Sequence, residues 1–450
     1  MSAALGPPLD PVESDSTLPR QVDVVVIGGG IIGVCATLFL ARRGISVALC
    51  EKGVIGGEQS SRNWGWCRTI GRDLRELPLA MESLRLWAGM NALAEAETGF
   101  RPSGVAYLCD DAAEVAHYES WLARAADQHR DYQRVAHVLS AGEVERVAPG
   151  TTNAYAGALH APADGRAEPQ KAAPAIAQAA RRSGAAILTG CAVRGLDLAA
   201  GRVAGVVTER GRIACSAVVL AGGAWSRLLC STAGVTLPQL KVLASVLRTN
   251  PVAGGPDTAL WATGFGIRRR LDGGFTIANG SSSRVDIVPD SFRFLRQFLP
   301  IARAEWKYLR PRLGRRFLEE WGEPSQLAPD RPTVFERVRI LDPEPEIALS
   351  EGALAIVKKA FPALQGATVA QHWAGLIDVT PDAVPVISAV ETVPGLFIAT
   401  GFSGHGFGIG PGAGRLVADL VSGGEPVVDP APFRLSRFRD GEKIRIESGF

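Results

Sequence analysis

Apolar positions along the chain follow two periods, and the first of them predicts buried strands at the start of an α/β protein. Residues 24–27, VVVI, are β-branched with no polar position between them, as in a strand covered on both faces. Three glycines at 28–30 then lead into an apolar helical run, and VALC at 47–50 predicts a second strand. This strand, turn, helix and strand unit indicates the beginning of a parallel sheet.

Further elements follow in two blocks of different character. Helical periodicity predicts helices at 77–88, 114–126 and 173–180, and short apolar runs predict strands at 104–108, 186–188 and 217–220, with a ribbon over 193–208. Residues 235–371 instead carry strand patterns at 240–247, 265–271 and 274–278, the last two joined by the hairpin signal Asp272-Gly273. The second block therefore predicts an antiparallel sheet.

The order of these blocks predicts a nucleotide-binding domain interrupted by a second domain. The expected fold class is α/β, with a Rossmann-like domain over 21–103, 155–234 and 372–425 and a discontinuous α+β domain, built on an antiparallel sheet, over 104–154 and 235–371. Residues 1–20 hold prolines and acids without an apolar core, so we expect a disordered lead-in, and residues 426–450 are expected to form a C-terminal tail.

Gly28, Gly30 and Gly33 have the spacing of a dinucleotide-binding turn between a strand and a helix. The first permits the tight turn, the second admits a pyrophosphate, and the third packs the helix against the strand. The helix N-terminus then favours the negative charge of a phosphate. Glu51 follows the second strand, where its carboxylate can accept both hydroxyls of an adenosine ribose and would repel a 2′-phosphate.

The loop over residues 53–68 is expected at the carboxyl end of a parallel strand, where such sheets bind ligands. Its side chains Trp64, Trp66 and Arg68 would either wall a substrate pocket or anchor the loop by packing.

Two later segments also contain a strand followed by a glycine-rich turn. The strand at 217–220 enters Gly222 and Gly223, a second place where backbone can approach a nucleotide. The segment 395–421 contains a strand, a glycine-rich loop and a helix that we expect to begin near Pro411, with its positive end directed at whatever the loop covers.

Composition indicates an ordinary globular protein, with 46% hydrophobic and 21% charged residues and a net charge of +2, so binding to nucleic acid is not expected. Seven cysteines lack metal-ligand spacing, which predicts no metal site and a reducing, cytoplasmic environment. Residues 292–316 hold eight Lys and Arg against the single acid Glu305. This basic segment is either a docking surface for a partner, a funnel for an anionic substrate, or a plain solvated face.

Together these motifs resemble the FAD-dependent D-amino acid oxidase superfamily, the group of glycine oxidase, sarcosine oxidase and bacterial D-amino acid dehydrogenases. The resemblance rests on VVVIGGGIIG with Glu51, on GEQSSRNWG, VVLAGGAWS and WAGLIDVTPDAVPVI, and on GLFIATGFSGHGFGIGPG. It implies FAD at residues Gly28, Gly30, Ile32, Gly33, Glu51, Lys52, Ser60, Ser61, Asn63, Trp64, Val193, Gly222, Gly223, Trp225, Gly401, Gly404, His405, Gly406, Phe407 and Gly408.

The chain departs from the pattern of this superfamily at its substrate and flavin contacts. Ile377 stands where glycine-oxidase-like members have an arginine that binds the substrate carboxylate, and Gly408 stands where sarcosine-oxidase-like members have a lysine. No cysteine lies near Gly375, the position of the flavin-linking cysteine, so noncovalent FAD is expected. The candidates for the carboxylate contact are then Arg68 and Arg268.

Two more residues are candidates for catalytic roles. His405 either contacts flavin or substrate, or is a loop residue hydrogen-bonded to backbone. Thr276 aligns with the lysine that favours oxygen reduction in sarcosine-oxidase-like members, and its lack of charge favours a dehydrogenase over an oxidase.

The resemblance implies an FAD-dependent oxidoreductase that oxidises the C–N bond of a D-amino acid, N-alkyl glycine, imino acid or opine by hydride transfer to flavin N5, after which the imine is hydrolysed. The alternative is an FAD-binding subunit that passes electrons to a partner through the basic segment. The electron acceptor is expected to be oxygen, a quinone or a redox protein, and the location the cytoplasm or the periphery of the inner membrane.

Overall fold

The computed structural model describes residues 6–280, 283–306, 309–322, 327–440 and 444–447. Its first domain is organised around a six-stranded sheet with the order β20-β21-β12-β1-β2-β8. The strands are β1 (Val24–Ile27), β2 (Val47–Cys50), β8 (Ala186–Leu188), β12 (Ala217–Leu220), β20 (Val386–Ala389) and β21 (Leu396–Thr400). The central strand β1 runs parallel to both neighbours, β2 and β12, and β20 pairs antiparallel at one edge. Every residue of β1 and β2 is buried, which confirms the two predicted strands.

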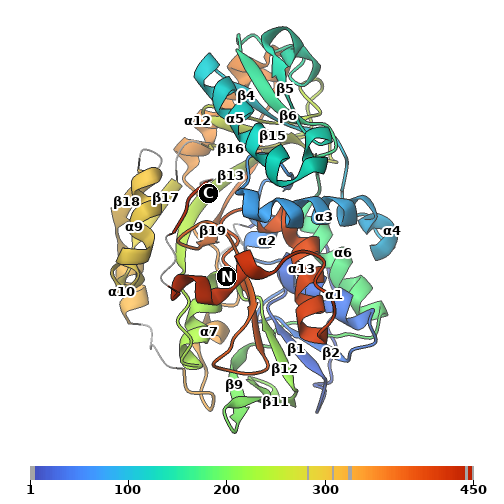
Figure 1. Cartoon of the computed structure of the whole chain (residues 1–450), viewed down its shortest axis with the longest axis vertical. Coiled ribbons are helices and arrows are strands. Elements are labelled where there is room, and N and C mark those ends of the chain that lie inside the picture. Colours follow the sequence, from blue (N-terminus) through green and yellow to red (C-terminus); the bar gives the residue numbers. More distant parts are fainter. Residues whose placement is uncertain (1–5, 281–282, 307–308, 323–326, 441–443, 448–450) are drawn as a thin grey trace.

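Helices cover one face of this sheet (Figure 1). They are α1 (Ile31–Ala41), α3 (Leu77–Ala88), α4 (Met90–Ala94), α6 (Pro169–Arg182) and α13 (Gly406–Ser422). α13 begins at Gly406 and not near Pro411, because its glycines let it approach α1 closely: a Cβ on Gly414 would lie 2.4 Å from Cβ of Cys35. Close packing therefore outweighs the poor helix propensity of this glycine-rich run.

The opposite face carries a smaller layer. A three-stranded antiparallel sheet of β9 (Val193–Ala199), β10 (Arg202–Thr208) and β11 (Gly211–Ala214) packs there with α7 (Ser226–Thr232) and α11 (Val334–Arg337). Alternate residues of β1 point to the two layers, Val24 and Val26 to the helices and Val25 and Ile27 to the smaller sheet. The nucleotide-binding sheet is therefore buried on both sides, as its unbroken apolar strands predict.

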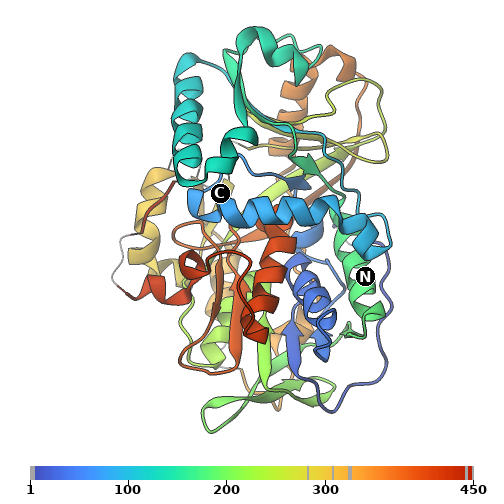
Figure 2. The same cartoon turned by 45° about the vertical axis from the view of Figure 1, so that its right-hand side comes forward.

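The second domain is built on a ten-stranded sheet, β18-β17-β13-β16-β15-β14-β4-β6-β5, with β19 paired to the central strand β13. Its strands are β4 (Val105–Cys109), β5 (His137–Ser140), β6 (Gly157–Ala161), β13 (Leu240–Thr249), β14 (Ala259–Ala262), β15 (Phe265–Arg269), β16 (Phe275–Ala278), β17 (Ser283–Ile287), β18 (Leu309–Leu313) and β19 (Val369–Val379). Most pairs are antiparallel, as predicted, and β4–β14 and β17–β18 are parallel. Helices α5 (Ala112–Gln128) and α12 (Ile347–Ala360) pack on it, and α3 lies across the junction of the domains (Figure 2).

The strand pairing moves two of the predicted domain boundaries. β6 pairs with β4 and β5, so residues 157–161 belong to the second sheet and not to a nucleotide-binding segment that starts at 155. β19 pairs with β13 along its whole length, so residues 372–379 also belong to the second sheet. Local apolar patterns locate both strands but carry no information about which sheet each strand joins.

The N-terminal segment is ordered from residue 6, which corrects the predicted disordered lead-in over residues 6–20. Asp15 accepts a hydrogen bond from the backbone N–H of Ile187 at 2.8 Å and pairs with Arg181 at 3.0 Å, and Asp10 pairs with Lys171. The acids that suggested a solvated tail therefore bind the basic side chains of α6. Near the other end of the chain, Arg437 makes a bidentate pair with buried Asp382.

The basic segment projects from one side of the second sheet (Figure 1). It runs from the end of α8 (Pro289–Arg293) through α9 (Leu295–Ala304) and β18 to the start of α10 (Arg315–Trp321), and its residues Lys307 and Tyr308 lie outside the described ranges. Phe294 and Phe298 point inward and are buried, whereas Phe292 and Trp306 are exposed. Within the described ranges, none of the helices combines the length and apolar character needed to cross a bilayer.

Candidate functional site

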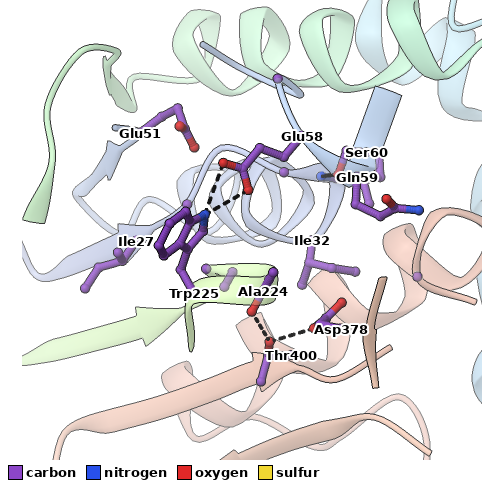
Figure 3. A pocket seen from close by; sticks show the side chains of 18 of the residues that line it. Ile27, Ile32, Glu51, Glu58, Gln59, Ser60, Ala224, Trp225, Asp378 and Thr400 are labelled. Carbon is purple, nitrogen blue, oxygen red and sulfur yellow. Dashed lines mark hydrogen bonds between the residues drawn. The ribbon is translucent and has the colours of Figure 1, made fainter. Parts of the chain in front are cut away.

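The first of two cavities lies at the carboxyl ends of β1, β2 and β12, beside the start of α1 (Figure 3). Gly28 has a φ of 109°, and a Cβ on Gly33 would lie 1.9 Å from the carbonyl oxygen of Gly28, so the turn requires glycine at both positions. Gly30 precedes α1 and has no side chain to cap it, and Ser60 Oγ accepts a hydrogen bond from the N–H of Ile31 at 2.8 Å. The positive end of α1 is therefore open to an anionic ligand.

Glu51 lines this cavity directly after β2. Its carboxylate accepts hydrogen bonds from the backbone N–H groups of Gly29 and Gly53, both at 2.7 Å. Burial raises the pKa of Glu51, and the charge of Lys52 opposes that shift. A carboxylate has about four lone-pair sites, so the two backbone contacts leave acceptor capacity for the hydroxyls of a ribose.

Glu58 connects the two sides of the cavity, and the sequence patterns did not point to it. Its carboxylate accepts from the indole N–H of Trp225 at 3.0 Å and pairs with Lys52 at 2.5 Å (Figure 3). The Lys52 ammonium also lies 4.8 Å from the centre of the Trp225 ring. The segment between β2 and α2 (Gln59–Arg62) is thus tied to the residue that follows Ala224 along the cavity wall.

Asp378 forms a second polar cluster at the base of the same cavity. One of its carboxylate oxygens accepts hydrogen bonds from the backbone N–H of Gly401 at 2.6 Å and from Gln239 Nε2 at 3.2 Å. The same oxygen accepts from Thr400 Oγ1 at 3.0 Å (Figure 3). Burial raises the pKa of Asp378, and these donors oppose the shift. The cluster ties the end of β19 to the end of β21 beneath the loop that precedes α13.

The second cavity adjoins the first under the large sheet. The two share Gln59, Asn63, Ile377, Gly404 and Phe407 in their walls, so these residues mark the boundary between them. Aromatic side chains dominate the second wall, namely Trp64, Trp66, Tyr107, Tyr118 and Trp261. Trp64 and Trp66 meet edge to face with ring centres 5.2 Å apart, and Tyr107 and Trp261 lie 5.6 Å apart.

Arg68 brings a positive charge into this aromatic space. Its guanidinium donates to the carbonyl oxygens of Ile70 and Gly71 and lies 5.6 Å from the centre of the Tyr107 ring. No carboxylate of the described residues lies within 4 Å of its nitrogens, in contrast to Arg62 and Arg72, which pair with Asp342 and Glu76. Arg68 is therefore available to bind an anionic group of a ligand.

Comparison with known proteins assigns the family. A family model described as FAD dependent oxidoreductase matches residues 23–420. The chain belongs to this family. Its cofactor is accordingly FAD, and the first cavity, with its helix N-terminus, its glycine turn and the carboxylate of Glu51 after β2, suits that molecule.

Three relatives show the range within the family. Glycine oxidase from Pseudomonas putida is 28% identical, with 91% of this chain and 97% of that protein aligned. Sarcosine oxidase subunit beta from Rhodobacter capsulatus is 24% identical over 94% of this chain and 90% of its own length. The structure of L-amino acid deaminase from Proteus myxofaciens in complex with anthranilate is similar with a TM-score of 0.92, 32% identity and coverage of 97% of this chain and 98% of that one.

Most of the residues expected to bind FAD line the first cavity. They are Gly28, Gly30, Ile32, Glu51, Lys52, Ser60, Asn63, Val193, Gly222, Gly223, Trp225, Gly404, Gly406 and Phe407. Trp64, His405 and Gly408 line the second cavity instead. Gly33, Ser61 and Gly401 line neither cavity, but they contact the lining residues Gly28, Glu58 and Asp378 respectively. Glu58, Gln59, Phe335, Arg339, Asp378 and Thr400 also line the first cavity and were not predicted.

Two of the expected catalytic residues lie outside both cavities. Arg268 on β15 is 1% exposed, and its guanidinium donates to both carboxylate oxygens of Glu168, at 2.8 and 3.2 Å. Thr276 is buried on β16 between β13 and β15, where its hydroxyl accepts from Arg270 at 3.3 Å. The expectations that Arg268 binds a substrate carboxylate and that Thr276 faces the flavin are therefore wrong, because neighbouring strands and Glu168 enclose both side chains.

The Arg268–Glu168 pair instead links the two domains, and its loss should be costly. Burial opposes ionisation of Glu168, but Arg268 outweighs it and holds the pKa of Glu168 at about 2. Glu168→Gln leaves a buried guanidinium without its partner, which we expect to destabilise the fold by about 3–5 kcal/mol. Unfolding in guanidinium chloride measures this loss.

The same pair predicts a pH dependence of stability. Because the folded pKa lies below the unfolded value of 4.5, the stabilisation is present above pH 4.5 and is lost as the pH falls toward 2. The matched control is Glu319→Gln, which breaks the exposed pair with Arg315 and should cost less than about 1 kcal/mol. Equal losses for the two variants would contradict the assigned role.

Noncovalent binding of FAD is a further expectation. The seven cysteines are buried and free, and of these Cys50 alone lines the FAD cavity, at the end of β2 beside Glu51. That position is next to the predicted ribose contact, and Cys50 does not line the second cavity. Acid precipitation should release yellow flavin into the supernatant, whereas colour retained in the pellet would reveal a covalent bond.

Proposed function

We propose that this FAD-dependent oxidoreductase oxidises the C–N bond of L-amino acids with large apolar or aromatic side chains. The observation that carries the proposal is Arg68, a guanidinium without a carboxylate partner among the described residues, inside an aromatic cavity that adjoins the FAD cavity. FAD, when bound, supplies the acceptor for a hydride. The similarity to an L-amino acid deaminase supports the choice of amino acids as substrates and of the L configuration at the α-carbon.

The residues of the second cavity divide the recognition of such a substrate between them. Arg68 binds the α-carboxylate, which fixes one end of the amino acid. The indole and phenol rings contact the side chain and exclude water from the reacting carbon. Ile377 and Phe407, at the junction of the cavities, then place the α-carbon at the flavin end of the space. The oxidation produces an imine. Water then hydrolyses the imine to a 2-oxo acid and ammonia.

A panel of amino acids and amines, mixed anaerobically with the enzyme, tests this proposal. L-Phenylalanine, L-leucine and other large L-amino acids should remove the yellow colour of the oxidised flavin, and glycine, sarcosine and D-amino acids should do so slowly. Rapid loss of colour with glycine or sarcosine alone would assign the activity of the other relatives instead.

We further propose that the reduced enzyme passes its electrons to a quinone at a membrane surface. Large apolar side chains of the basic segment and of the rest of α10 are exposed, including Phe292, Trp306, Leu318 and Trp321 at 65–72%. They alternate with arginines at 293, 296, 303, 310, 312 and 315. Apolar side chains within a basic surface suit the headgroup region of an anionic bilayer. Glu305 and Leu309 of the same segment line the second cavity, so this surface adjoins the site of reaction.

Reoxidation distinguishes this acceptor from oxygen. No lysine of the described residues lines the second cavity to favour reduction of oxygen, and Lys307 lies outside those residues. In stopped-flow mixing, oxygenated buffer should reoxidise the reduced enzyme more slowly than turnover, and anionic vesicles that contain quinone should reoxidise it faster.

A variant of the exposed surface supplies the control. Phe292→Ser combined with Trp321→Ser should abolish the effect of vesicles and leave flavin reduction by the amino acid unchanged. Fast reoxidation by oxygen alone would make the enzyme an oxidase. Reoxidation that requires a second protein subunit would favour the alternative of a hetero-oligomeric dehydrogenase.

A further inference from the structure

The imidazole of His405 is held in one orientation at the wall of the second cavity. His405 immediately precedes α13, lines the cavity and is 5% exposed. Its Nδ1 lies 3.1 Å from Oε2 of Glu76, which belongs to the short 3₁₀ helix Leu74–Glu76. Because an ionised carboxylate only accepts hydrogen bonds, Nδ1 carries the hydrogen of the neutral ring, and Nε2 remains an acceptor.

Glu76, which contacts the His405 ring, is a buried carboxylate with one oxygen unpaired within the described ranges. It is fully buried, its Oε2 also accepts from Arg72 at 3.3 Å, and its Oε1 has no hydrogen-bond partner among the described residues. A buried carboxylate that leaves one oxygen unpaired costs free energy. Glu76 therefore has two buried partners, Arg72 and His405, and its contact with Nδ1 fixes the orientation of the His405 ring.

Several charged and ionisable groups face His405 or share its cavity. Glu76 approaches from the 3₁₀ helix, and Arg68 and Arg72 approach from the preceding loop. Tyr107, Tyr118 and Glu305 line the same cavity on other elements. Burial lowers the pKa of His405, Glu76 opposes the shift, and the two arginines add to it. Burial and the two arginines therefore favour the neutral form of the ring before substrate binds.

We propose that His405 removes the ammonium proton of the bound amino acid through Nε2 and that Glu76 is its positioning residue, an inference that rests on the proposed function. Amino acids arrive as zwitterions, and hydride can leave the α-carbon only when the nitrogen lone pair is free. One N–H bond of the ammonium breaks, its electron pair stays on nitrogen, and the proton moves to Nε2. The α-C–H bond then breaks, its electron pair leaves with the hydride, for which FAD would be the acceptor, and the nitrogen lone pair forms the C=N bond. The proton returns to solvent before the next turnover.

The substrate carboxylate assists this transfer. When it pairs with Arg68, its negative charge offsets one of the two arginine charges that disfavour a protonated His405. The zwitterion therefore supplies both the proton and the charge that allows His405 to accept it. The same coupling implies that an aromatic carboxylate without an amine, such as benzoate, binds with uptake of a proton by His405.

The test is the pH dependence of flavin reduction in anaerobic stopped-flow experiments with L-phenylalanine. The wild-type rate should rise with pH along a limb set by the pKa of His405. His405→Gln should lose this limb, fall by about 100-fold or more, and regain rate only as the pH approaches the pKa of the free amino group. Glu76→Gln keeps an acceptor for Nδ1 but removes the negative charge, so the limb should move to lower pH. His372→Gln, on β19 outside both cavities, is the matched control and should behave as wild type.

Benzoate binding, followed through the flavin spectrum, gives a readout that needs no turnover. Its affinity should increase as the pH falls through the wild-type limb and should lose that dependence in His405→Gln. A wild-type limb preserved in His405→Gln, an unmoved limb in Glu76→Gln, or pH-independent benzoate binding by the wild type would each overturn the role of His405 while the proposed function stands. A wild-type enzyme that no amino acid reduces would overturn both.

Discussion

Arg68→Ala should lower kcat/KM for L-phenylalanine roughly 30- to 5,000-fold, which corresponds to a loss of about 2–5 kcal/mol of transition-state stabilisation. The substrate carboxylate would then enter a largely aromatic cavity without its paired charge. Arg68→Lys should recover part of the loss, because a lysine restores the charge but not the planar two-point contact. Steady-state kinetics with the full chain measure both variants.

Two comparisons separate this effect from damage to the cavity. Arg85→Ala removes an exposed arginine of α3 that pairs with Glu82, and it should leave kcat/KM unchanged. Phenethylamine, which lacks the carboxylate, should be an equally poor substrate for wild type and Arg68→Ala. An Arg68→Ala enzyme with wild-type kcat/KM for amino acids would show that the substrate is an amine without an α-carboxylate.

Glu51→Ala should weaken FAD binding by about 3–6 kcal/mol, since two charge-assisted hydrogen bonds to the ribose are lost at about 1.5–3 kcal/mol each. Flavin fluorescence during titration of the apoprotein measures the change in Kd. The variant also deprives the N–H groups of Gly29 and Gly53 of their acceptor, so its thermal stability must be measured in parallel.

Addition of excess FAD distinguishes weaker FAD binding from a loss of folding stability. If Glu51 binds the ribose, the variant should refill at high FAD concentration and then be reduced by amino acid at nearly the wild-type rate, because the change lies far from the reacting carbon. An unaltered Kd for FAD would remove Glu51 from the proposed contacts.

The sequence predicts the nucleotide-binding half of the fold well because its strands are continuous apolar runs with sharp ends. β1, β2, β8 and β12 have the predicted bounds, and the glycine turn lies between the predicted strand and helix. Domain boundaries were less accurate, since β6 and β19 join the second sheet through pairing with distant strands. The start of α13 was also misplaced, because its glycines favour helix only through contact with α1.

The substrate side of the site was harder to predict for a related reason. From the sequence, Arg68 and Arg268 are equally plausible partners for a substrate carboxylate. Only the fold shows that Glu168 already pairs with Arg268. Glu58, Glu76 and Asp378 were not predicted, and Glu58 and Glu76 become parts of the site through partners more than 150 residues away, Trp225 and His405. Partners in a buried polar network are set by tertiary contact, which local periodicity does not report.

The most direct test of the central claim is anaerobic reduction of the enzyme by L-phenylalanine carrying deuterium at the α-carbon. If a hydride leaves that carbon for the FAD, the L-amino acid should remove the flavin colour, the deuterated form should do so several times more slowly, and the D-amino acid should be far less effective. Reduction that is insensitive to α-deuterium would contradict rate-limiting cleavage of that bond. An enzyme that keeps its oxidised flavin colour with every L-amino acid would contradict the proposed function itself.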